Sequence, residues 1–249
     1  DENALEDLLV GRLEPDEAKA AARAVGLVLS RQYVVVAHTA EPRGAVSDAV
    51  SASLITNVIA RMGIRYYSVT VANALLLAAE HHGLDDNELH GALTAAEESG
   101  WRLCIGFGDP VEPAHLHVSA RQARQALALG SDASTGSIVH FDNLGALKLL
   151  ATLPLAEIDH NDDVSRMLSV AETKKGVGDL ALLEAYCDTG SLRRTAELFH
   201  FHHSSVDYRL RGLEARLGFT LTTQNGRLRA LVAAKLAKLA SMSDLGATQ

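Results

Sequence analysis

The chain has 249 residues, of which 47% are hydrophobic and 22% are charged, and its formal net charge is −8. This balance is typical of a globular protein with a sizeable core, and the length allows two modest domains. Two cysteines, no visible signal peptide and no apolar run of about 20 residues argue against a disulfide framework and a membrane span. We therefore expect a cytoplasmic protein with no membrane partner.

The charge is distributed unevenly along the chain. Residues 1–178 carry 14 basic and 24 acidic side chains, a net −10, whereas residues 179–249 carry 9 basic and 7 acidic side chains, a net +2. The sign changes where the composition also changes, which predicts two domains with different partners. The predicted parts are a helical lead-in (1–24), an α+β domain (25–152), a linker (153–178) and a helical domain (179–249).

The first half of the chain alternates helix and strand patterns. The lead-in places Pro15 at a helix start, and the β-branched run 32–38 predicts a buried strand. A helix should follow, with Ser47 as a candidate N-cap and Gly63 as its stop.

A hairpin is predicted next. Two apolar runs, 64–70 and 74–80, should turn near Ala72 and Asn73, although Ala and Leu make the second run ambiguous with helix. The remaining pattern predicts a helix at 85–100, a strand at 101–108, a helix at 119–130 and a strand at 137–141. The order is β-α-β-β-α-β-α-β, an α+β sheet with its helices mainly on one face.

The segment 153–178 is polar and charged and ends in glycines, so we expect a connection with a short helix inside. A first helix of the last domain should cover about 180–187 and stop at Gly190. Ser191 can cap a second helix that buries Leu192, Ala196 and Phe199 on one face. The turn "HFHH" then places Phe201 as a plug between the helices.

The third helix of this domain is strongly patterned. Ser204 has the position of an N-cap, and Asp207 three residues later completes a variant capping box. One stripe should pack inward and comprises Val206, Leu210, Leu213 and Leu217. The opposite face should hold Ser204, Tyr208 and Arg211, flanked by Ser205 and Arg209. Gly218 should end the helix.

This arrangement predicts a helix-turn-helix whose second helix enters a major groove of double-stranded DNA by its N-terminus. Hydroxyls of Ser204, Ser205 and Tyr208 suit phosphates or base edges, and Arg209 and Arg211 suit guanine or phosphate. The alternative is an ordinary helical hairpin with a solvated arginine face. A later amphipathic helix, 227–240, should turn Leu228, Leu231, Val232, Leu236 and Leu239 inward. Its Arg229, Lys235 and Lys238 should face solvent or the DNA backbone.

Three histidines in four positions, His200, His202 and His203, raise the alternative of a metal site. They lack helical i, i+4 spacing, and no nearby cysteine or acid cluster completes a tetrahedral set. We therefore expect no metal here, and instead expect His202 and His203 to cap backbone groups or touch phosphate. The pairs "HLH" (115–117) and "HH" (81–82) are interpreted as loop or surface residues.

The segment from Ala196 to Gly218 resembles the C-terminal helix-turn-helix of the PucR/CdaR family of bacterial transcriptional regulators. The family pattern is approximately A-x-x-L-x-V-H-R-N-T-L-x-Y-R-L-x-x-I-E-x-L-x-G. It corresponds here to Ala196, Phe199, Phe201, His202, His203, Ser204, Ser205, Val206, Tyr208, Arg209, Leu210, Leu213, Glu214 and Gly218. The Arg-Asn-Thr of the family is replaced by His203, Ser204 and Ser205, which exchanges one fixed cation for a titratable group.

Residues 25–152 resemble the GGDEF-like domain that precedes this helix-turn-helix in CdaR-type regulators, which implies a ferredoxin-like βαββαβ fold. Active diguanylate cyclases carry two glycines and two acids on a hairpin that holds Mg²⁺ against nucleotide phosphates. The matching hairpin "YYSVTVANALLL" has neither glycine nor acid. We therefore expect a degenerate, catalytically inactive domain that serves dimerisation or signalling, with no catalytic residues and no cofactor.

One glycine motif remains. "GFGD" (106–109) is only loosely similar to a phosphate-binding loop and is better explained as a tight turn after a strand. The sequence as a whole predicts a sequence-specific transcriptional regulator. One short recognition helix buries too little surface for tight binding, so we expect a homodimer, and a small-molecule inducer is a further expected partner. The rival hypothesis is a nucleotide- or ligand-binding signalling protein whose helical C-terminus mediates protein contacts.

Overall fold

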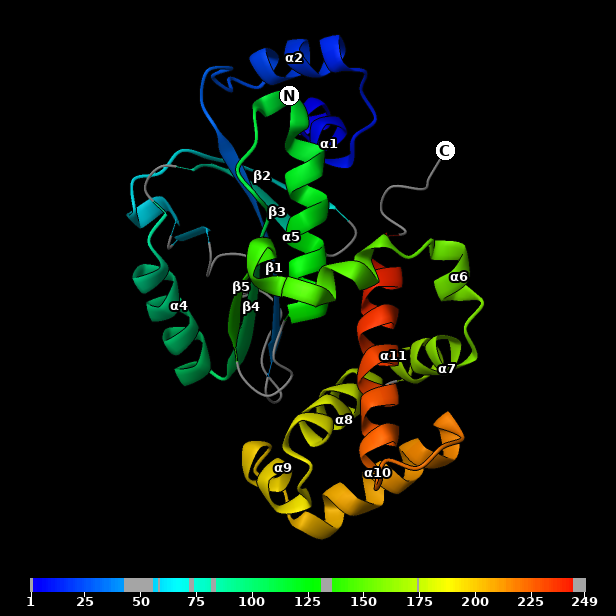
Figure 1. Cartoon of the computed structure of the whole chain (residues 1–249). Helices are drawn as coiled ribbons and strands as arrows, with labels where there is room; N and C mark the ends of the chain where they lie inside the picture. Colours follow the sequence, from blue (N-terminus) through cyan, green and yellow to red (C-terminus); the bar gives the residue numbers. More distant parts are fainter. Residues whose placement is uncertain are drawn as a thin grey trace. The chain divides into compact units, whose positions relative to one another are not determined.

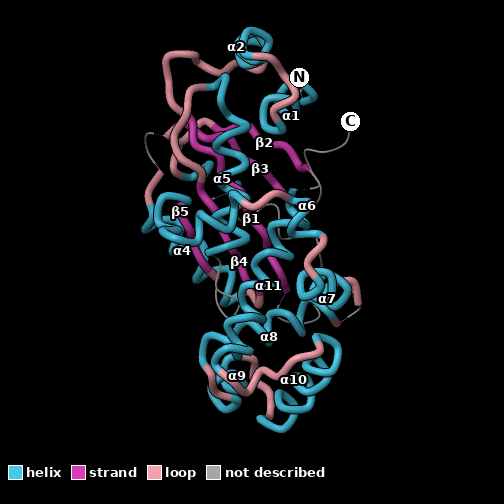
Figure 2. The backbone as a smooth tube through the Cα atoms, turned by 45° about the vertical axis from the view of Figure 1, so that its right-hand side comes forward, coloured by secondary structure: helices cyan, strands magenta, loops and turns pink. Residues whose placement is uncertain are grey.

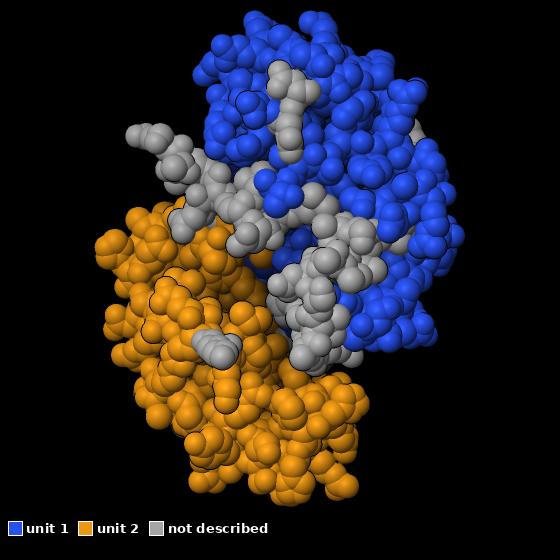
Figure 3. All heavy atoms as spheres, turned by 180° about the vertical axis from the view of Figure 1, so that it is seen from behind, with its two compact units in different colours: residues 1–131, 135–148, 244–249 blue, residues 132–134, 149–243 orange. Residues whose placement is uncertain are grey.

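The structure is a computed structural model that describes residues 2–42, 56–57, 59–71, 74–81, 84–130, 136–173 and 175–243. The described residues form two compact units, which Figure 3 shows in two colours. The N-terminal unit contains described residues up to 148, and the C-terminal unit contains residues 149–243. Three predictions lie outside the described residues: the Ser47 cap, the turn at Ala72 and Asn73, and His82.

The N-terminal unit is built on one five-stranded sheet (Figure 1). Its strands are β1 (Tyr33–Pro42), β2 (Tyr66–Val71), β3 (Ala74–Glu80), β4 (Trp101–Phe107) and β5 (Ser137–His140). Their order is β2-β3-β1-β4-β5, and every neighbouring pair is antiparallel except β4 and β5, which are parallel. The first four strands thus have the predicted ferredoxin-like arrangement, and the ambiguous run 74–80 is a strand.

Alternation along the strands divides the side chains between two faces. On one face, Val34, Val36, Ile105 and Phe107 are buried against the helix α4 (Asp86–Glu98). On the other face lies α5 (Leu116–Gly130), which packs on β1 and β4. The expectation that helices lie mainly on one face is therefore wrong, because α5, the crossover helix between the parallel strands β4 and β5, covers the second face.

The glycines of "GFGD" lie where the sheet contacts α5 and do not form a tight turn. Gly106 lies inside β4, and a Cβ built on it would overlap the carbonyl oxygen of Ala123 in α5. Gly108 follows the strand, still donates its N–H to the carbonyl of Val35 at 3.0 Å, and would overlap Ser119 if it carried a Cβ. The tight-turn prediction is corrected: both glycines allow strand and helix backbones to approach each other.

The predicted lead-in belongs to the N-terminal unit. It forms α1 (Glu2–Val10) and α2 (Pro15–Ala24), with Pro15 in the first turn as predicted and Glu14 as the N-cap. Leu5, Leu8 and Leu9 of α1 are buried, and α1 packs against α5 and β2. The helix α2 packs against η2 (Pro113–His115), so these residues complete the first core rather than precede it.

The C-terminal unit is wholly helical in its described residues (Figure 2). After η3 (Phe141–Thr152), which crosses from one unit to the other, its helices are α6 (Leu155–Asp159), α7 (Asp162–Ala171), α8 (Gly176–Thr189), α9 (Leu192–Leu198), α10 (His203–Leu217) and α11 (Gln224–Ser243). Within the predicted linker, Ile158, Val164, Met167 and Val170 are buried in the core of this unit. The linker assignment is therefore corrected, since α6 and α7 are part of the folded helical unit.

The last helix, α11, exists as predicted but buries a different face. Leu239 is buried, whereas Leu228 is 59% exposed and Leu231, Val232 and Leu236 are only partly buried. The buried positions are mainly alanines, at 230, 233, 234, 237 and 240. Small side chains let α11 lie close to α7 and α8, which the hydrophobic pattern alone did not reveal.

None of the helices that the structure describes is both long enough and apolar enough to cross a membrane.

Candidate nucleic-acid interface

The helices α8, α9 and α10 form the predicted helix-turn-helix. Gly190 adopts a left-handed conformation with φ 61° and ends α8, which begins earlier than predicted, at Gly176. Ser191 caps α9 by accepting a hydrogen bond from the N–H of Arg194. The buried Thr195 bonds the hydroxyl of Thr189 at 2.9 Å. These contacts lock the angle between α8 and α9, as the Gly-Ser signal predicts.

The core of the motif is also as predicted on α9 and α10. Ala196 is buried, and Leu192 and Phe199 pack against the same core. On α10, the stripe of Val206, Leu210, Leu213 and Leu217 is buried, and Gly218 ends the helix with φ 79°. The inward-facing leucines therefore orient the rest of α10 outward.

The turn between α9 and α10 differs from the prediction. Phe201 is 43% exposed and does not plug the core. Its N–H bonds the carbonyl of Ala196 at 2.9 Å, and its ring lies 6.2 Å from that of Phe199. His200 before it has φ 53°, a left-handed conformation that points the chain outward. Because the backbone turns at His200, the Phe201 ring lies at the surface of the motif.

The cap of α10 is also different from the predicted one. His202 is the N-cap, and its Nδ1 accepts from the N–H of Ser204 at 3.4 Å and lies 2.7 Å from the Ser204 hydroxyl oxygen. The helix begins at His203, so Ser204 lies within its first turn and cannot cap it. The predicted Ser204–Asp207 capping box is wrong, and Asp207 instead pairs with Arg211 at 3.0 Å. The hydroxyls of Ser204 and Ser205 consequently lie on the exposed side of the helix start.

The outward face of α10 holds most of the predicted DNA-contacting side chains. Tyr208 is 80% exposed, and the Arg211 side chain is 74% exposed. His203, Ser204 and Ser205 are also exposed, and the rings of His202 and His203 lie 4.2 Å apart. We refer to His203, Ser204, Ser205, Tyr208 and Arg211 as the outer face of α10. It brings hydroxyls and a guanidinium together at the N-terminal half of one helix.

Arg209 does not share this exposure. Its side chain is 25% exposed, and its Nε and Nη2 atoms lie 2.7 and 2.5 Å from Oδ1 of Asp179 in α8. The guanidinium also lies over the ring of Phe201, 5.2 Å from its centroid. The expectation of a solvent-facing Arg209 is corrected, because its position on the flank of α10 directs it toward the start of α8.

Sequence reasoning missed two basic residues of α9. Arg193 and Arg194 are exposed, and Arg193 forms only a long i, i+4 ion pair of 3.6 Å with Glu197. The signal was present in "SLRRTAEL", where both arginines follow the capping serine directly. They add positive charge beside the outer face of α10.

Two cations predicted to face solvent or DNA are instead structural. Arg229 pairs with Asp163 at 2.5 Å and lies over the ring of Phe219, and this pairing lowers the pKa of Asp163. Lys238 bonds the buried Glu184 at 2.7 Å. Both contacts hold α11 to earlier helices, so neither side chain is assigned to the candidate interface.

Two histidines of these groups have roles in capping and packing, and the prediction of loop or surface positions is wrong for His117, which lies in α5 and is partly buried. His202 caps α10, and His117 lies against Gly11, where burial lowers the pKa of its imidazole. Among the residues that the structure describes, no three histidine, cysteine, aspartate or glutamate side chains are grouped to hold a metal.

The hairpin of the N-terminal unit comprises β2 and β3. Its described residues, Tyr66–Val71 and Ala74–Glu80, include no glycine and one acid, Glu80, at the end far from the turn. Glu80 pairs with Arg31 at 2.6 Å. A Mg²⁺-binding hairpin of the cyclase type therefore has no matching ligands among these residues.

A ferredoxin-like α+β unit followed by a helical unit with a capped α8–α9–α10 motif defines a two-domain protein of the helix-turn-helix class. Comparison with known families extends this: the PucR C-terminal helix-turn-helix domain matches residues 180–236, and the GGDEF-like domain matches residues 10–129. The chain thus carries a GGDEF-like domain followed by a PucR C-terminal helix-turn-helix domain, and the predicted resemblance to PucR-type transcriptional regulators is confirmed.

Two further comparisons concern individual proteins. A search of curated proteins finds no match to this chain. Among solved structures, the chain is similar to the crystal structure of a regulator of polyketide synthase expression from Bifidobacterium adolescentis. The two chains are 18% identical, 94% of this chain and 96% of that chain are covered, and the TM-score is 0.41.

Proposed function

We propose that this regulator binds double-stranded DNA sequence-specifically as a cytoplasmic homodimer, with α10 lying in the major groove. The observation that carries the proposal is the division of α10 into two sides. Four apolar side chains anchor it in the core, while Tyr208 and Arg211 extend into solvent from its opposite side. A helix held in this way can present its N-terminal half to a groove without losing packing.

The residues of the interface have different roles in this proposal. Ser204, Ser205 and His203, at the start of α10, face phosphates, where backbone N–H groups and hydroxyls position the helix. Tyr208 and Arg211 contact base edges, and the ion pair with Asp207 restricts the Arg211 guanidinium to a few orientations.

The remaining residues support the helix or the DNA backbone. His202 maintains the cap and stays at the border of the contact. Arg209, predicted as a base contact, is now assigned a positioning role, because it joins α10 to Asp179 of α8 and covers Phe201. Arg193 and Arg194 on α9 add contacts to flanking phosphates, which supply affinity without sequence preference.

Dimerisation follows from the size of one recognition helix. A single helix of 15 residues with five outward side chains covers about one half-site, and a symmetric pair of half-sites supplies the rest of the specific affinity. The GGDEF-like unit serves this assembly and responds to a small-molecule inducer. Because its hairpin lacks the glycines and acids of a cyclase site, we propose that it does not form products from GTP and Mg²⁺.

The first experiment is a salt titration of the full chain with a fluorescent duplex of mixed sequence. The observed affinity should fall steeply with salt, and Arg193→Ala should reduce the slope of log K against log salt by about 1. Lys19→Ala, which removes an exposed cation of α2, is the matched control and should leave the slope unchanged. Absence of binding at low salt would favour the rival role, in which the helical C-terminus contacts proteins.

The second experiment tests sequence preference. A protection footprint on DNA from the neighbourhood of the chain's own gene should show two protected segments about one helical turn, or a multiple of it, apart. Binding spread evenly over this DNA would contradict sequence-specific regulation, even if the salt titration shows phosphate contacts.

A further inference from the structure

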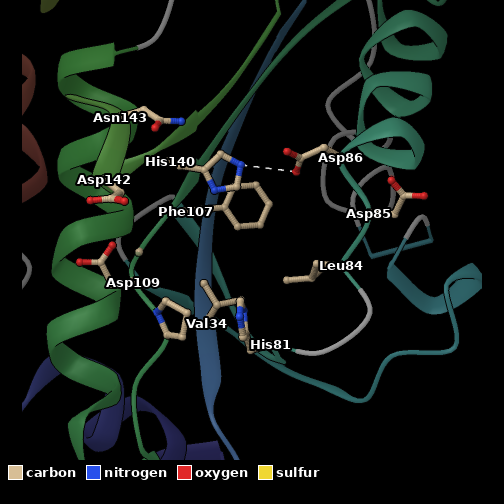
Figure 4. Close-up of a pocket in the computed structure, with 12 residues that line it drawn as sticks. Val34, His81, Leu84, Asp85, Asp86, Phe107, Asp109, His140, Asp142 and Asn143 are labelled. Carbon is tan, nitrogen blue, oxygen red and sulfur yellow. Dashed lines mark ion pairs between the residues drawn. The ribbon is translucent and has the colours of Figure 1, made fainter. Parts of the chain in front are cut away.

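A cavity of about 640 Å³ lies at one edge of the sheet of the N-terminal unit (Figure 4). It is at the end of the sheet opposite the turn of the β2–β3 hairpin, where β3, β4 and β5 all end. The strands β4 and β5 are parallel, and both end in a residue that lines the cavity, Phe107 and His140. The carboxyl ends of parallel strands are a common position for ligand sites in sheets with helices on both faces, and this volume suits a small ligand.

The floor of the cavity is a pair of stacked rings. The imidazole of His140 lies on the ring of Phe107, with centroids 4.7 Å apart and planes within 14° of parallel. Phe107 is buried beneath, so the free face of His140 forms a flat surface between the two sides of the cavity. The buried Nε2 of His140 makes no hydrogen bond to any described residue, although it lies 3.4 Å from a carboxylate oxygen of Asp86. A flat ring surface of this kind favours a planar group on the ligand.

The carboxylates of the lining lie on two sides of the cavity. Asp85 and Asp86 lie on one side of the ring pair, and Asp109 and Asp142 lie on the other (Figure 4). Among the residues that the structure describes, neither a lysine nor an arginine lines the cavity. Asp142 has Lys148 at 3.3 Å, and Asp109 is bonded to the neutral side chain of Gln122. Two separated pairs of carboxylates across a flat ring surface are complementary to a molecule with a positive charge at each end.

We propose that this cavity binds a small organic dication, with a guanidinium or similar planar cation on the His140 ring between two pairs of aspartates. A guanidinium can stack on an imidazole and share its N–H donors with Asp86, while an ammonium at the other end reaches Asp109 and Asp142. The site deepens the proposed function and rests on it, because it gives the inducer of the regulator a position and a chemical class.

Agmatine, which joins a guanidinium to an ammonium through four methylenes, is the probe for this site. Isothermal titration of the full chain at low salt should show saturable binding with a Kd of about 0.1 mM, typical for a ligand of this size. The probe 4-guanidinobutanoate keeps the guanidinium but carries a carboxylate in place of the ammonium. It should bind at least about tenfold more weakly, because the new charge faces Asp109 and Asp142.

Three variants locate the binding. Asp86→Asn and Asp142→Asn should each weaken agmatine by about tenfold, since each removes one charge-assisted contact. Glu98→Gln is the matched control: it removes the same charge from the other end of α4, about 18 Å from Asp86 along the helix, and should leave the affinity unchanged. If Asp86→Asn lowers the melting temperature, Asp142→Asn decides the test, because the exposed Asp142 side chain lies at the rim.

The inference is overturned if agmatine gives no saturable heat, or if Asp142→Asn binds agmatine as tightly as the unaltered chain. The titration contains no DNA, so its outcome is independent of the footprint. Binding of agmatine by a chain that does not bind DNA would leave this site in place and contradict the regulator function. A chain that protects DNA without binding agmatine would leave the function and remove the site.

Discussion

The contact between β4 and α5 and the outer face of α10 place opposite demands on their residues. At Gly106, strand and helix backbones approach so closely that one methyl group would overlap the carbonyl of Ala123. On α10, Tyr208 and Arg211 extend into solvent, and a larger or smaller side chain would displace nothing. The comparison separates residues that determine whether the chain folds from residues that determine what the folded chain binds.

The largest expected effect on stability is at the contact between β4 and α5. Gly106→Ala should lower the free energy of unfolding of the N-terminal unit by about 3 kcal/mol, because the added Cβ requires a shift of the whole of α5. Trp101 is the one tryptophan of the chain and is buried in β4, so its fluorescence in urea reports this unit. Gly212→Ala is the matched control in α10, where a built Cβ meets no atom within 4 Å. This control lies in the other unit and should leave the Trp101 unfolding curve unchanged, so equal effects of both changes would contradict the comparison.

The second prediction concerns pH and the same unit. His38 is buried in β1, its ring nitrogens make no hydrogen bond to any described residue, and burial lowers its pKa from 6.5 to about 4. Between these values the unfolded chain binds the proton more readily, so stability is complete above pH 6.5 and falls as the pH drops toward 4. The loss should be about 2 kcal/mol at pH 5, measured by Trp101 fluorescence in urea.

A variant isolates the contribution of this one histidine. His38→Leu keeps an apolar environment of similar size and should be less sensitive to pH between 7 and 5 than the unaltered chain. An identical pH dependence of both proteins would show that other groups control acid unfolding.

The third prediction belongs to the outer face of α10. Arg211→Ala should weaken specific DNA binding by about 1.5 kcal/mol and alter the preferred base at one position of each half-site. The free energy of unfolding should change by less than about 0.5 kcal/mol, because the side chain is exposed. Selection from a randomised duplex pool measures the preference. An unchanged preferred sequence would remove Arg211 from the base-contacting set.

The smallest effect is expected at Arg209, which supports both the fold of the C-terminal unit and the position of α10. A double-mutant cycle of Asp179→Asn and Arg209→Gln should give a coupling of about 1 kcal/mol in the stability of the C-terminal unit, since both side chains are half-buried. Both variants should weaken all duplexes similarly and leave the preferred sequence intact, unlike Arg211→Ala. A changed preference in Arg209→Gln would return this residue to the base-contacting role.

Local patterns were sufficient for much of the architecture. The inward stripe of α10, the stops at Gly190 and Gly218 and the cap at Ser191 depend on neighbours within one or two turns, and all follow from spacing. The strand pattern of the N-terminal unit succeeded for the same reason. The order β2-β3-β1-β4 followed from the family resemblance, because pairing between distant strands has no local signal.

The failures share a different physical origin. Arg209 is directed to Asp179, which lies 30 positions earlier, and no periodicity connects the two. The segment 153–178 is polar and charged in pattern, yet Ile158 and Val164 are buried because α11 returns to cover them. On α11 the hydrophobic pattern favoured leucines, while close helix contact selected alanines. In these three places a partner distant in sequence determined the environment, whereas the errors at Phe201 and Ser204 arose from the local turn at His200 and the cap at His202.

The central position of β1 has a consequence for how the chain is made. Val36 pairs with Leu77 on one side and with Phe107 on the other, so both partners leave the ribosome long after it does. Until β4 is synthesised, the run from Val34 to Ala37 remains an apolar strand without a second neighbour. Such nascent segments fold slowly and invite association with other chains. Synthesis that pauses before residue 107 should therefore increase the demand for chaperones more than a pause after it.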